Sequence, residues 1–194
     1  MKNLFCVFFV FQSLIGVGQD EFFETVADSA KILASDYVVY DPSYYSISYP
    51  GGDIPKGKGV CTDVIIRAYR KLGIDLQKEV HLDMKKSFDD YPKIWGLKKP
   101  DRNIDHRRVP NLMRFFERHQ AKLPISSIAS DYQPGDIVCW NLGGAVTHIG
   151  IVIKGKSEDG QRHLIVHNIG SGQVIKDCLF DYKIIGHYRY RKSQ

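Results

Sequence analysis

The sequence predicts a single α+β domain, in which helices from the first half pack on an antiparallel sheet from the second half. Apolar residues recur at helical spacing through the first half of the chain. After Pro134-Gly135-Asp136 they fall instead in short runs separated by turn residues, which is the pattern of strands. A length of 194 residues, 43% hydrophobic and 25% charged, fits one globular domain.

The composition also excludes several classes of protein. Four cysteines are too few for a disulfide scaffold, and no low-complexity tract or internal repeat is present. The net charge of +5 favours contact with an anionic polymer but is too small to predict nucleic-acid binding. Because no phosphate-cradling glycine loop or nucleic-acid motif occurs either, we expect neither a nucleic-acid partner nor a cofactor.

The first nineteen residues have the features of a signal peptide. A short positive start, Met1-Lys2-Asn3, precedes an apolar run over 4–17, and small or polar residues follow up to Gln19. The run is short for a membrane span, although an N-terminal anchor is the alternative. We therefore expect an exported protein, periplasmic or secreted, whose mature domain covers 20–194 without an integral span.

Four helices are predicted in the first half. Their apolar stripes and end signals place them at about 20–35, at 61–72 before Gly73, at 76–88, and after Pro110 through Phe116. A loop rich in Tyr, Ser, Pro and Gly is expected from Tyr40 to Gly59. Five strands follow as a predicted antiparallel meander, at 137–140, 147–153, 163–169, 174–180 and 184–190.

Cys61 is the first candidate for chemistry, because it opens the second predicted helix after a flexible glycine-containing loop. Backbone N–H groups at a helix start stabilise a thiolate and receive an oxyanion, which predicts a lowered pKa for this cysteine. Removal of residues 1–19 leaves three cysteines, so at least one thiol is unpaired. The alternative is a small buried core residue. Cys139 and Cys178 lie in predicted strands and are expected to be buried thiols rather than a disulfide.

Two histidines in apolar strands supply a candidate base and its partner. If the hairpin loop at 155–160 folds symmetrically, His148 lies directly opposite His167, and one imidazole can orient the other. A one-residue bulge would place Asn168, instead of His167, opposite His148. A merely structural histidine pair is the alternative. No metal site is expected, because no pair of ligands has the spacing of a zinc motif.

Several motifs resemble those of papain-like cysteine peptidases, and of the NlpC-type cell-wall branch in particular. They are Tyr49-Pro50-Gly51-Gly52 before Cys61, Pro134-Gly135-Asp136, and His148-Ile149-Gly150-Ile151. Four segments, 49–63, 95–97, 100–111 and 166–170, resemble the bacterial domain-of-unknown-function 1287 family more closely. The resemblance covers most of the mature chain and implies a papain-like fold.

One position departs from the NlpC-type pattern of Asp-Cys-Ser-Gly. Here Val60-Cys61-Thr62-Asp63 places the carboxylate after the cysteine, where its charge opposes a thiolate. Arg107 or Arg108, in the charged block 101–108, is expected either to restrain Asp63 or to hold a substrate carboxylate. A solvated surface loop is the alternative for this block.

Together these features predict a monomeric cysteine amidase or endopeptidase that acts on peptidoglycan stem peptides. Cys61 is the expected nucleophile, His148 its base and His167 the orienting residue, while Tyr49 is expected near the oxyanion. Export and the resemblance, rather than any peptide-reading motif, imply the substrate. A catalytically inactive cell-wall binding module and a secreted wall-degrading toxin are the alternatives.

Overall fold

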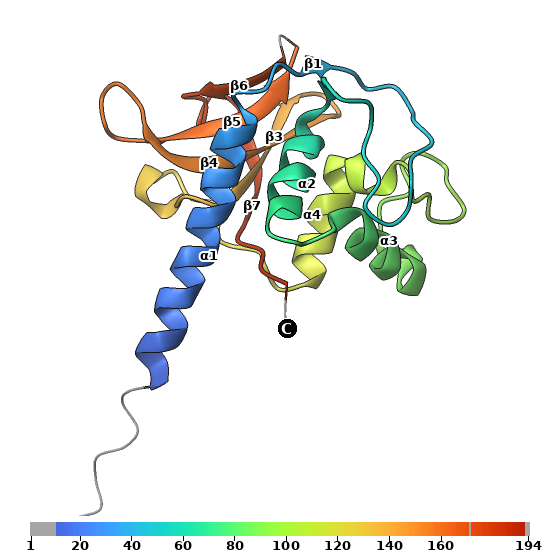
Figure 1. Ribbon diagram of the computed structural model, residues 1–194, viewed down its shortest axis with the longest axis horizontal. Coiled ribbons are helices and arrows are strands. Elements are labelled where there is room, and N and C mark those ends of the chain that lie inside the picture. Colours follow the sequence, from blue (N-terminus) through green and yellow to red (C-terminus); the bar gives the residue numbers. More distant parts are fainter. Residues whose placement is uncertain (1–10, 171, 193–194) are drawn as a thin grey trace, which may run out of the picture.

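The computed structural model describes the backbone of residues 11–170 and 172–192, with side chains from residue 21 onward. It confirms the α+β class (Figure 1). The four helices are α1 (Phe11–Leu33), α2 (Cys61–Lys71), α3 (Leu76–Lys86) and α4 (Val109–Arg118). The main sheet has five strands: β3 (Ile137–Gly143), β4 (Val146–Lys156), β5 (His163–Ile169), β6 (Gly172–Lys176) and β7 (Lys183–Tyr188).

The sheet order is β6-β5-β4-β3-β7, with antiparallel neighbours throughout. The first four strands form the predicted meander, but the last does not continue it, because β7 returns to pair with β3. The segment before β7 crosses one face of the sheet, where the Trp140 indole N–H donates to the Leu179 carbonyl at 2.9 Å. At the end of β7, Tyr188 packs on Phe116 of α4.

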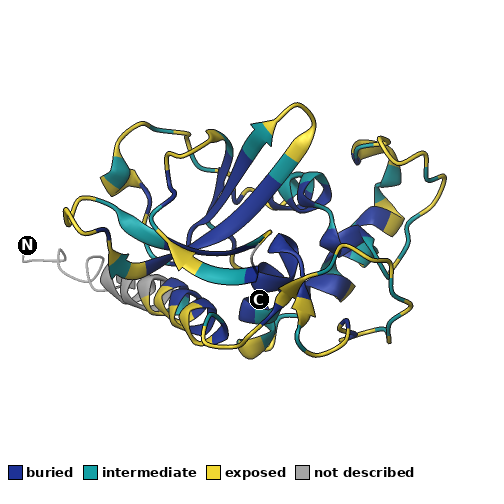
Figure 2. Ribbon diagram, turned by 90° about the horizontal axis from the view of Figure 1, so that it is seen from above, coloured by how far each residue is buried: buried dark blue, intermediate teal, exposed yellow. Residues whose placement is uncertain are grey.

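The sheet carries a core on each face, and long stretches of its strands are buried (Figure 2). On one face, α1, α2 and α4 cover the odd-numbered residues of β4, including Ile149 and Ile151. On the other face, Trp140 and Val152 belong to a smaller cluster covered by the crossing segment. Because successive strand residues alternate between faces, neighbours in sequence at the site point into different cores.

Two short strands within the predicted loop were not expected. β1 (Val39–Tyr40) pairs in parallel with β2 (Lys58–Gly59), with Tyr40 opposite Gly59. The Asp41 amide extends the pairing by donating to the Gly59 carbonyl at 2.9 Å. This pairing brings Tyr40 beside the start of α2, although the two are about twenty residues apart in sequence.

Helix α1 begins at Phe11 rather than near residue 20, so the predicted cleavage point after Gln19 lies within it. Residues 1–10 of the predicted signal peptide lie outside the described residues. In the described part of the chain, no helix is long and apolar enough to cross a membrane. Three short 3₁₀ helices complete the fold, at η1 (Phe88–Asp90), η2 (Asp105–Arg107) and η3 (Ala129–Asp131).

Candidate active site

Cys61 is the first residue of α2, as the sequence predicts. Val60 precedes it in an extended conformation, and the Asp63 carboxylate accepts a hydrogen bond from the Val60 amide at 2.7 Å. Asp63 thus caps the helix from its third position and satisfies a donor that the helix leaves unpaired. The acidic residue that departs from the NlpC-type pattern therefore has a structural reason in this chain.

Burial, however, reverses the expected effect on the thiol. Cys61 is 6% exposed, and burial raises the pKa of its thiol to about 12, with the nearby Asp63 charge adding to the rise. The backbone amides of Ile149, Thr62 and Cys61 act in the opposite direction but are outweighed. The expected lowered pKa is thus wrong, because loss of hydration outweighs the amides at the helix start. The resting side chain is a neutral thiol.

His148 and His167 are in contact, with His148 Nε2 2.9 Å from His167 Nδ1. Their rings meet edge to face, with centroids 5.0 Å apart. The predicted register is nevertheless wrong. Ile151 lies opposite Val166, and continuing this pairing places Gly150, not His148, opposite His167. The two histidines are therefore diagonal neighbours on one face of the sheet.

The register differs from the prediction because the hairpin loop is centred later in the sequence than expected and because β4 contains a bulge. The Ser157 amide bonds to the Arg162 carbonyl at 2.9 Å, so the loop closes later than expected. A bulge between Val152 and Lys156 then inserts two more residues into β4. A glycine is required at position 150, opposite His167, because a Cβ there would lie 2.6 Å from Ile165 Cγ2 and 2.9 Å from the Val166 carbonyl oxygen.

The Cys61 thiol contacts the backbone next to His148, not the His148 side chain. Cys61 packs in the helix-covered core, whereas His148 lies on the other face, with its ring 6.0 Å from that of Trp140. The amide of Ile149, the residue next to His148, faces the thiol. Among the described residues, no hydrogen bond joins the thiol to the imidazole. Burial lowers the pKa of His148 to about 3 and of His167 to about 4, so both rings are neutral.

Asn168, the alternative partner for His148, points to the opposite face from His167. Its side chain is fully buried, lies beside Gly59 and makes no hydrogen bond in the described structure. The structure thus brings His167, and not Asn168, to His148.

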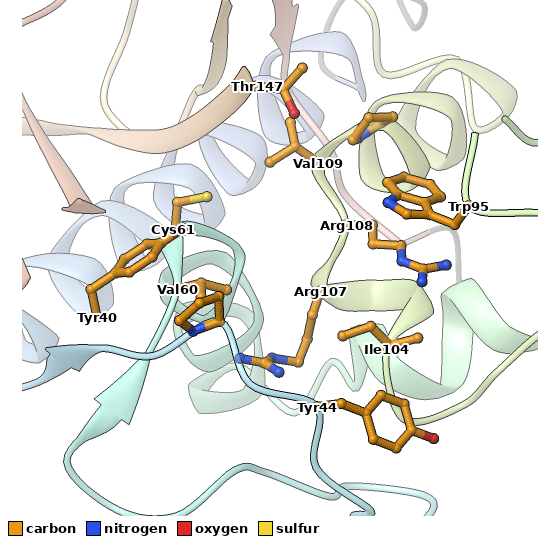
Figure 3. A pocket seen from close by; sticks show the side chains of 12 residues that line it. Tyr40, Tyr44, Val60, Cys61, Trp95, Ile104, Arg107, Arg108, Val109 and Thr147 are labelled. Carbon is orange, nitrogen blue, oxygen red and sulfur yellow. The ribbon is translucent and has the colours of Figure 1, made fainter. Parts of the chain in front are cut away.

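A pocket of about 410 Å³ opens beside Cys61 (Figure 3). Its walls are mostly aromatic and aliphatic, with two arginines: Tyr40, Pro42, Tyr44, Val60, Cys61, Trp95, Ile104, Arg107, Arg108, Val109, Pro110 and Thr147. Burial raises the pKa of Tyr40, and the neighbouring Cys61 adds to the rise. The sequence did not single out Tyr40, because two-residue strands leave no readable pattern.

Tyr49 does not lie near the thiol, so the prediction that it assists the oxyanion is wrong. Its ring packs edge to face on His81 of α3, with centroids 5.1 Å apart, and Arg102 lies over it. It is not among the residues that line the pocket. The tyrosine beside the thiol is Tyr40.

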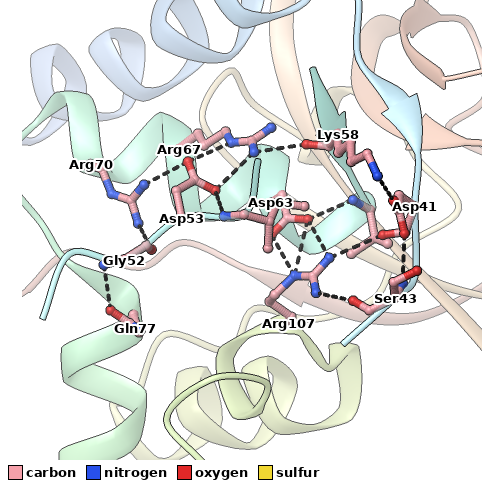
Figure 4. A network of polar contacts seen from close by, with 12 residues as sticks. Asp41, Ser43, Gly52, Asp53, Lys58, Asp63, Arg67, Arg70, Gln77 and Arg107 are labelled. Atoms are coloured by element: carbon pink, nitrogen blue, oxygen red, sulfur yellow. Dashed lines mark hydrogen bonds and ion pairs between the residues drawn. The ribbon is translucent and has the colours of Figure 1, made fainter. Parts of the chain in front are cut away.

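Arg107 contacts Asp63, one of the two roles expected for this arginine (Figure 4). Its Nε lies 3.1 Å from Asp63 Oδ1, and its terminal nitrogens donate to the Asp63 carboxylate and to the carbonyls of Asp41 and Ser43. Both charged side chains are buried. The bidentate pair joins the start of α2 to the strand that carries Tyr40.

Arg108 differs from its neighbour. Its guanidinium lies over the Trp95 ring, 4.1 Å from the centroid, at the wall of the pocket. The block 101–108 is thus not a simple solvated loop, since η2 buries Asp105, His106 and Arg107.

Cys139 and Cys178 are free and buried, as expected. In the described part of the chain, no three His, Cys, Asp or Glu side chains gather closely enough to hold a metal ion.

Comparison with known proteins gives relatives of two kinds. The uncharacterized protein YijF of Escherichia coli (strain K12) is 52% identical over 165 residues, which are 85% of this chain and 80% of that protein. Two crystal structures of an N-acetylmuramoyl-L-alanine amidase from Bacteroides uniformis ATCC 8492 have a similar fold, each with a TM-score of 0.50. They are 12% and 14% identical and cover 89% of this chain and 100% of theirs.

The sequence also matches a protein family. The model of the family described as Domain of unknown function (DUF1287) matches residues 27–190, which include all four helices in part or in full and every strand. The match contains Cys61, His148 and His167. On this match, the chain belongs to the DUF1287 family.

Proposed function

We propose that this protein is an exported cysteine hydrolase that cleaves amide bonds in the stem peptides of peptidoglycan, on a papain-like, NlpC-type fold. The observation that carries the proposal is the contact of His148 with His167, one residue from the amide that faces the Cys61 thiol. The fold similarity to structures titled N-acetylmuramoyl-L-alanine amidase supports the choice of substrate.

The histidine contact determines which nitrogen of His148 acts as the base. In this tautomer the Nε2–H group of His148 donates a hydrogen bond to His167 Nδ1. The other ring nitrogen of His148, Nδ1, then carries no proton and can accept one. That nitrogen takes the thiol proton as Cys61 Sγ attacks the amide carbon. His148 then gives the proton to the leaving amine, and water hydrolyses the thioester to a carboxylic acid and the free thiol.

The oxyanion that forms during attack needs donors close to the thiol. The backbone amides of Cys61 and Ile149 face it, and the Tyr40 hydroxyl is the nearby side-chain donor. Because both Cys61 and His148 rest in their neutral forms, proton transfer accompanies attack instead of preceding it. Cys61 and His148 lie on opposite faces of the sheet at rest, so the proposal includes a movement of the start of β4 that brings the imidazole to the thiol when substrate binds.

A cell-wall binding module is the second candidate. The observation that favours it is the buried thiol, whose pKa of about 12 gives it little nucleophilic character when no substrate is bound. In that case the pocket binds the wall without cleaving it.

Mass spectrometry of purified peptidoglycan after incubation with the protein separates the two. The hydrolase releases new stem-peptide fragments with the wild type and with Cys178→Ala, whose thiol is buried in the core on the other face of the sheet, but not with Cys61→Ala. Unchanged muropeptides, together with protein that sediments with the wall, would instead establish the binding module.

A further inference from the structure

Two consecutive arginines beside the pocket have opposite surroundings. The Arg107 guanidinium is bonded on all three nitrogens, to Asp63 and to two backbone carbonyls. The Arg108 guanidinium makes no hydrogen bond among the described residues, and its ion-pair partner, Asp105 Oδ1, is 3.8 Å away. One charge is neutralised within the fold, whereas the other faces the pocket with its donors unused.

The position of Arg108 is nonetheless fixed. Its side chain is 17% exposed and lies over the Trp95 ring, 4.1 Å from the centroid, in a cation–π contact that restrains the guanidinium. Burial raises the pKa of Asp105 to about 6, so this carboxylate is still ionised at pH 7, but at 3.8 Å it is too distant to accept a hydrogen bond from Arg108. Asp105 Oδ1 is itself buried without a hydrogen bond.

The pocket places this guanidinium in reach of the same ligand as the thiol. Cys61 projects from one side of the pocket, and Trp95 and Arg108 lie at the other (Figure 3). The walls between them are mainly apolar, with Ile104, Val109 and Pro110 among them. The hydrogen-bond donors of Arg108 are free, and an apolar wall strengthens the attraction of a cation for an anion because little water screens the pair.

We propose that Arg108, restrained by its contact with Trp95, binds a free carboxylate of the substrate and so selects peptides that carry one close to the scissile amide. This rests on the proposed hydrolase function and names the chemistry that its pocket recognises. Arg107 does not bind this carboxylate, because its N–H donors are already bonded to Asp63. A carboxylate fits the arginine fork through two parallel hydrogen bonds, which neither a carboxamide nor a hydroxyl can reproduce.

The test measures binding separately from turnover. Calorimetric titrations of the Cys61→Ala protein use a disaccharide-tripeptide muropeptide and the same compound with its carboxylates converted to carboxamides. We expect Arg108→Gln to weaken binding of the carboxylate form by roughly 10- to 100-fold and to leave the carboxamide form unchanged. Arg108→Lys recovers part of the affinity, because it restores the charge without the fork.

Two further variants keep the result specific. Arg102→Gln is the matched control, since Arg102 belongs to the same loop and lies over a ring, that of Tyr49, but does not line this pocket. Trp95→Leu should weaken binding of the carboxylate form alone, because the fork loses its support. Equal affinities of the unmutated pocket for the two compounds, or equal weakening of both by Arg108→Gln, would overturn the proposal.

The outcomes also separate this inference from the proposed function. Wild-type protein that discriminates the two compounds but cleaves neither retains the carboxylate site and refutes the hydrolase. Wild-type protein that cleaves both with equal kcat/KM, unaffected by Arg108→Gln, retains the hydrolase and refutes the site.

Discussion

Two buried histidine sites lie along β3, and they differ in how completely their polar atoms are bonded. At the start of the strand, Asp136 accepts hydrogen bonds from His187 Nε2 at 2.8 Å and from Arg189 Nε at 2.6 Å. His187 Nδ1 contacts the Pro124 carbonyl, and Tyr132 stacks on its ring. Each nitrogen of His187 therefore has a partner within the fold.

Further along β3, the region of His148 and Cys61 leaves several polar atoms without a hydrogen bond. His167 Nε2, both side-chain polar atoms of Asn168 and Thr62 Oγ1 are buried and unpartnered in the described structure. Each such atom costs about 1–3 kcal/mol. The fully bonded site stabilises the fold, whereas the other accepts a cost in stability and keeps polar atoms without partners near Cys61 and near His148.

Removal of the Asp136 carboxylate should give the largest effect on stability. Asp136→Ala leaves His187 and Arg189 without this buried acceptor, so we expect a loss of ~3–5 kcal/mol in the free energy of unfolding. Urea denaturation measures it. Glu158→Ala, at an exposed loop residue, is the control, with a change within ~0.5 kcal/mol. A loss below 1 kcal/mol at Asp136 would show that the bonded site is dispensable.

His167→Ala should affect activity rather than stability. Loss of the ring that orients His148 is expected to lower kcat by ~100-fold, while the melting temperature stays close to that of the wild type. Asn168→Ala is the matched variant on the neighbouring residue, and its effect on kcat should be much smaller, since Asn168 faces away from His148. The reverse ranking would transfer the orienting role to Asn168.

The pH dependence of stability sharpens the comparison. Burial lowers the pKa of His106, His148 and His167 from 6.5 to between about 3 and about 4 in the folded chain. Below pH 6.5 the unfolded chain binds more protons, so the free energy of unfolding falls by up to ~1.4 kcal/mol per pH unit for each ring.

Urea titrations at pH 7, 6 and 5 measure this slope. The double variant His148→Gln, His167→Gln should lose the part of the slope due to these two rings and keep the part due to His106 and the opposing part due to Asp105, whose pKa burial raises to about 6. An unchanged slope in the double variant would mean that both rings are hydrated in the folded protein.

The pH profile of catalysis is the smallest expected effect. Because His148 has a pKa of about 3 and Cys61 one of about 12, the reactive protonation states persist across the neutral range. We expect kcat to change by less than about threefold between pH 5 and 9. A rise with a midpoint near pH 6.5 would instead indicate a hydrated His148 and a thiolate–imidazolium pair.

Much of the fold could be predicted because its signals are local. The stripe of α2, its start at Cys61 and the bounds of β5 follow from residues within one turn or one strand. The return of β7 to β3 could not be predicted, since it depends on Tyr188 meeting Phe116, a contact between distant segments.

The sequence by itself determined the α+β class, the helix-start position of Cys61 and the shared strand face of His148 and His167. Those features follow from apolar periodicity and from strand alternation, which a shift of two residues leaves intact. Only the tertiary structure decided the register, the replacement of Tyr49 by Tyr40 and the division of roles between Arg107 and Arg108. It also decided the neutral state of the thiol, because a pKa depends on what surrounds a group in space and not on its neighbours in sequence.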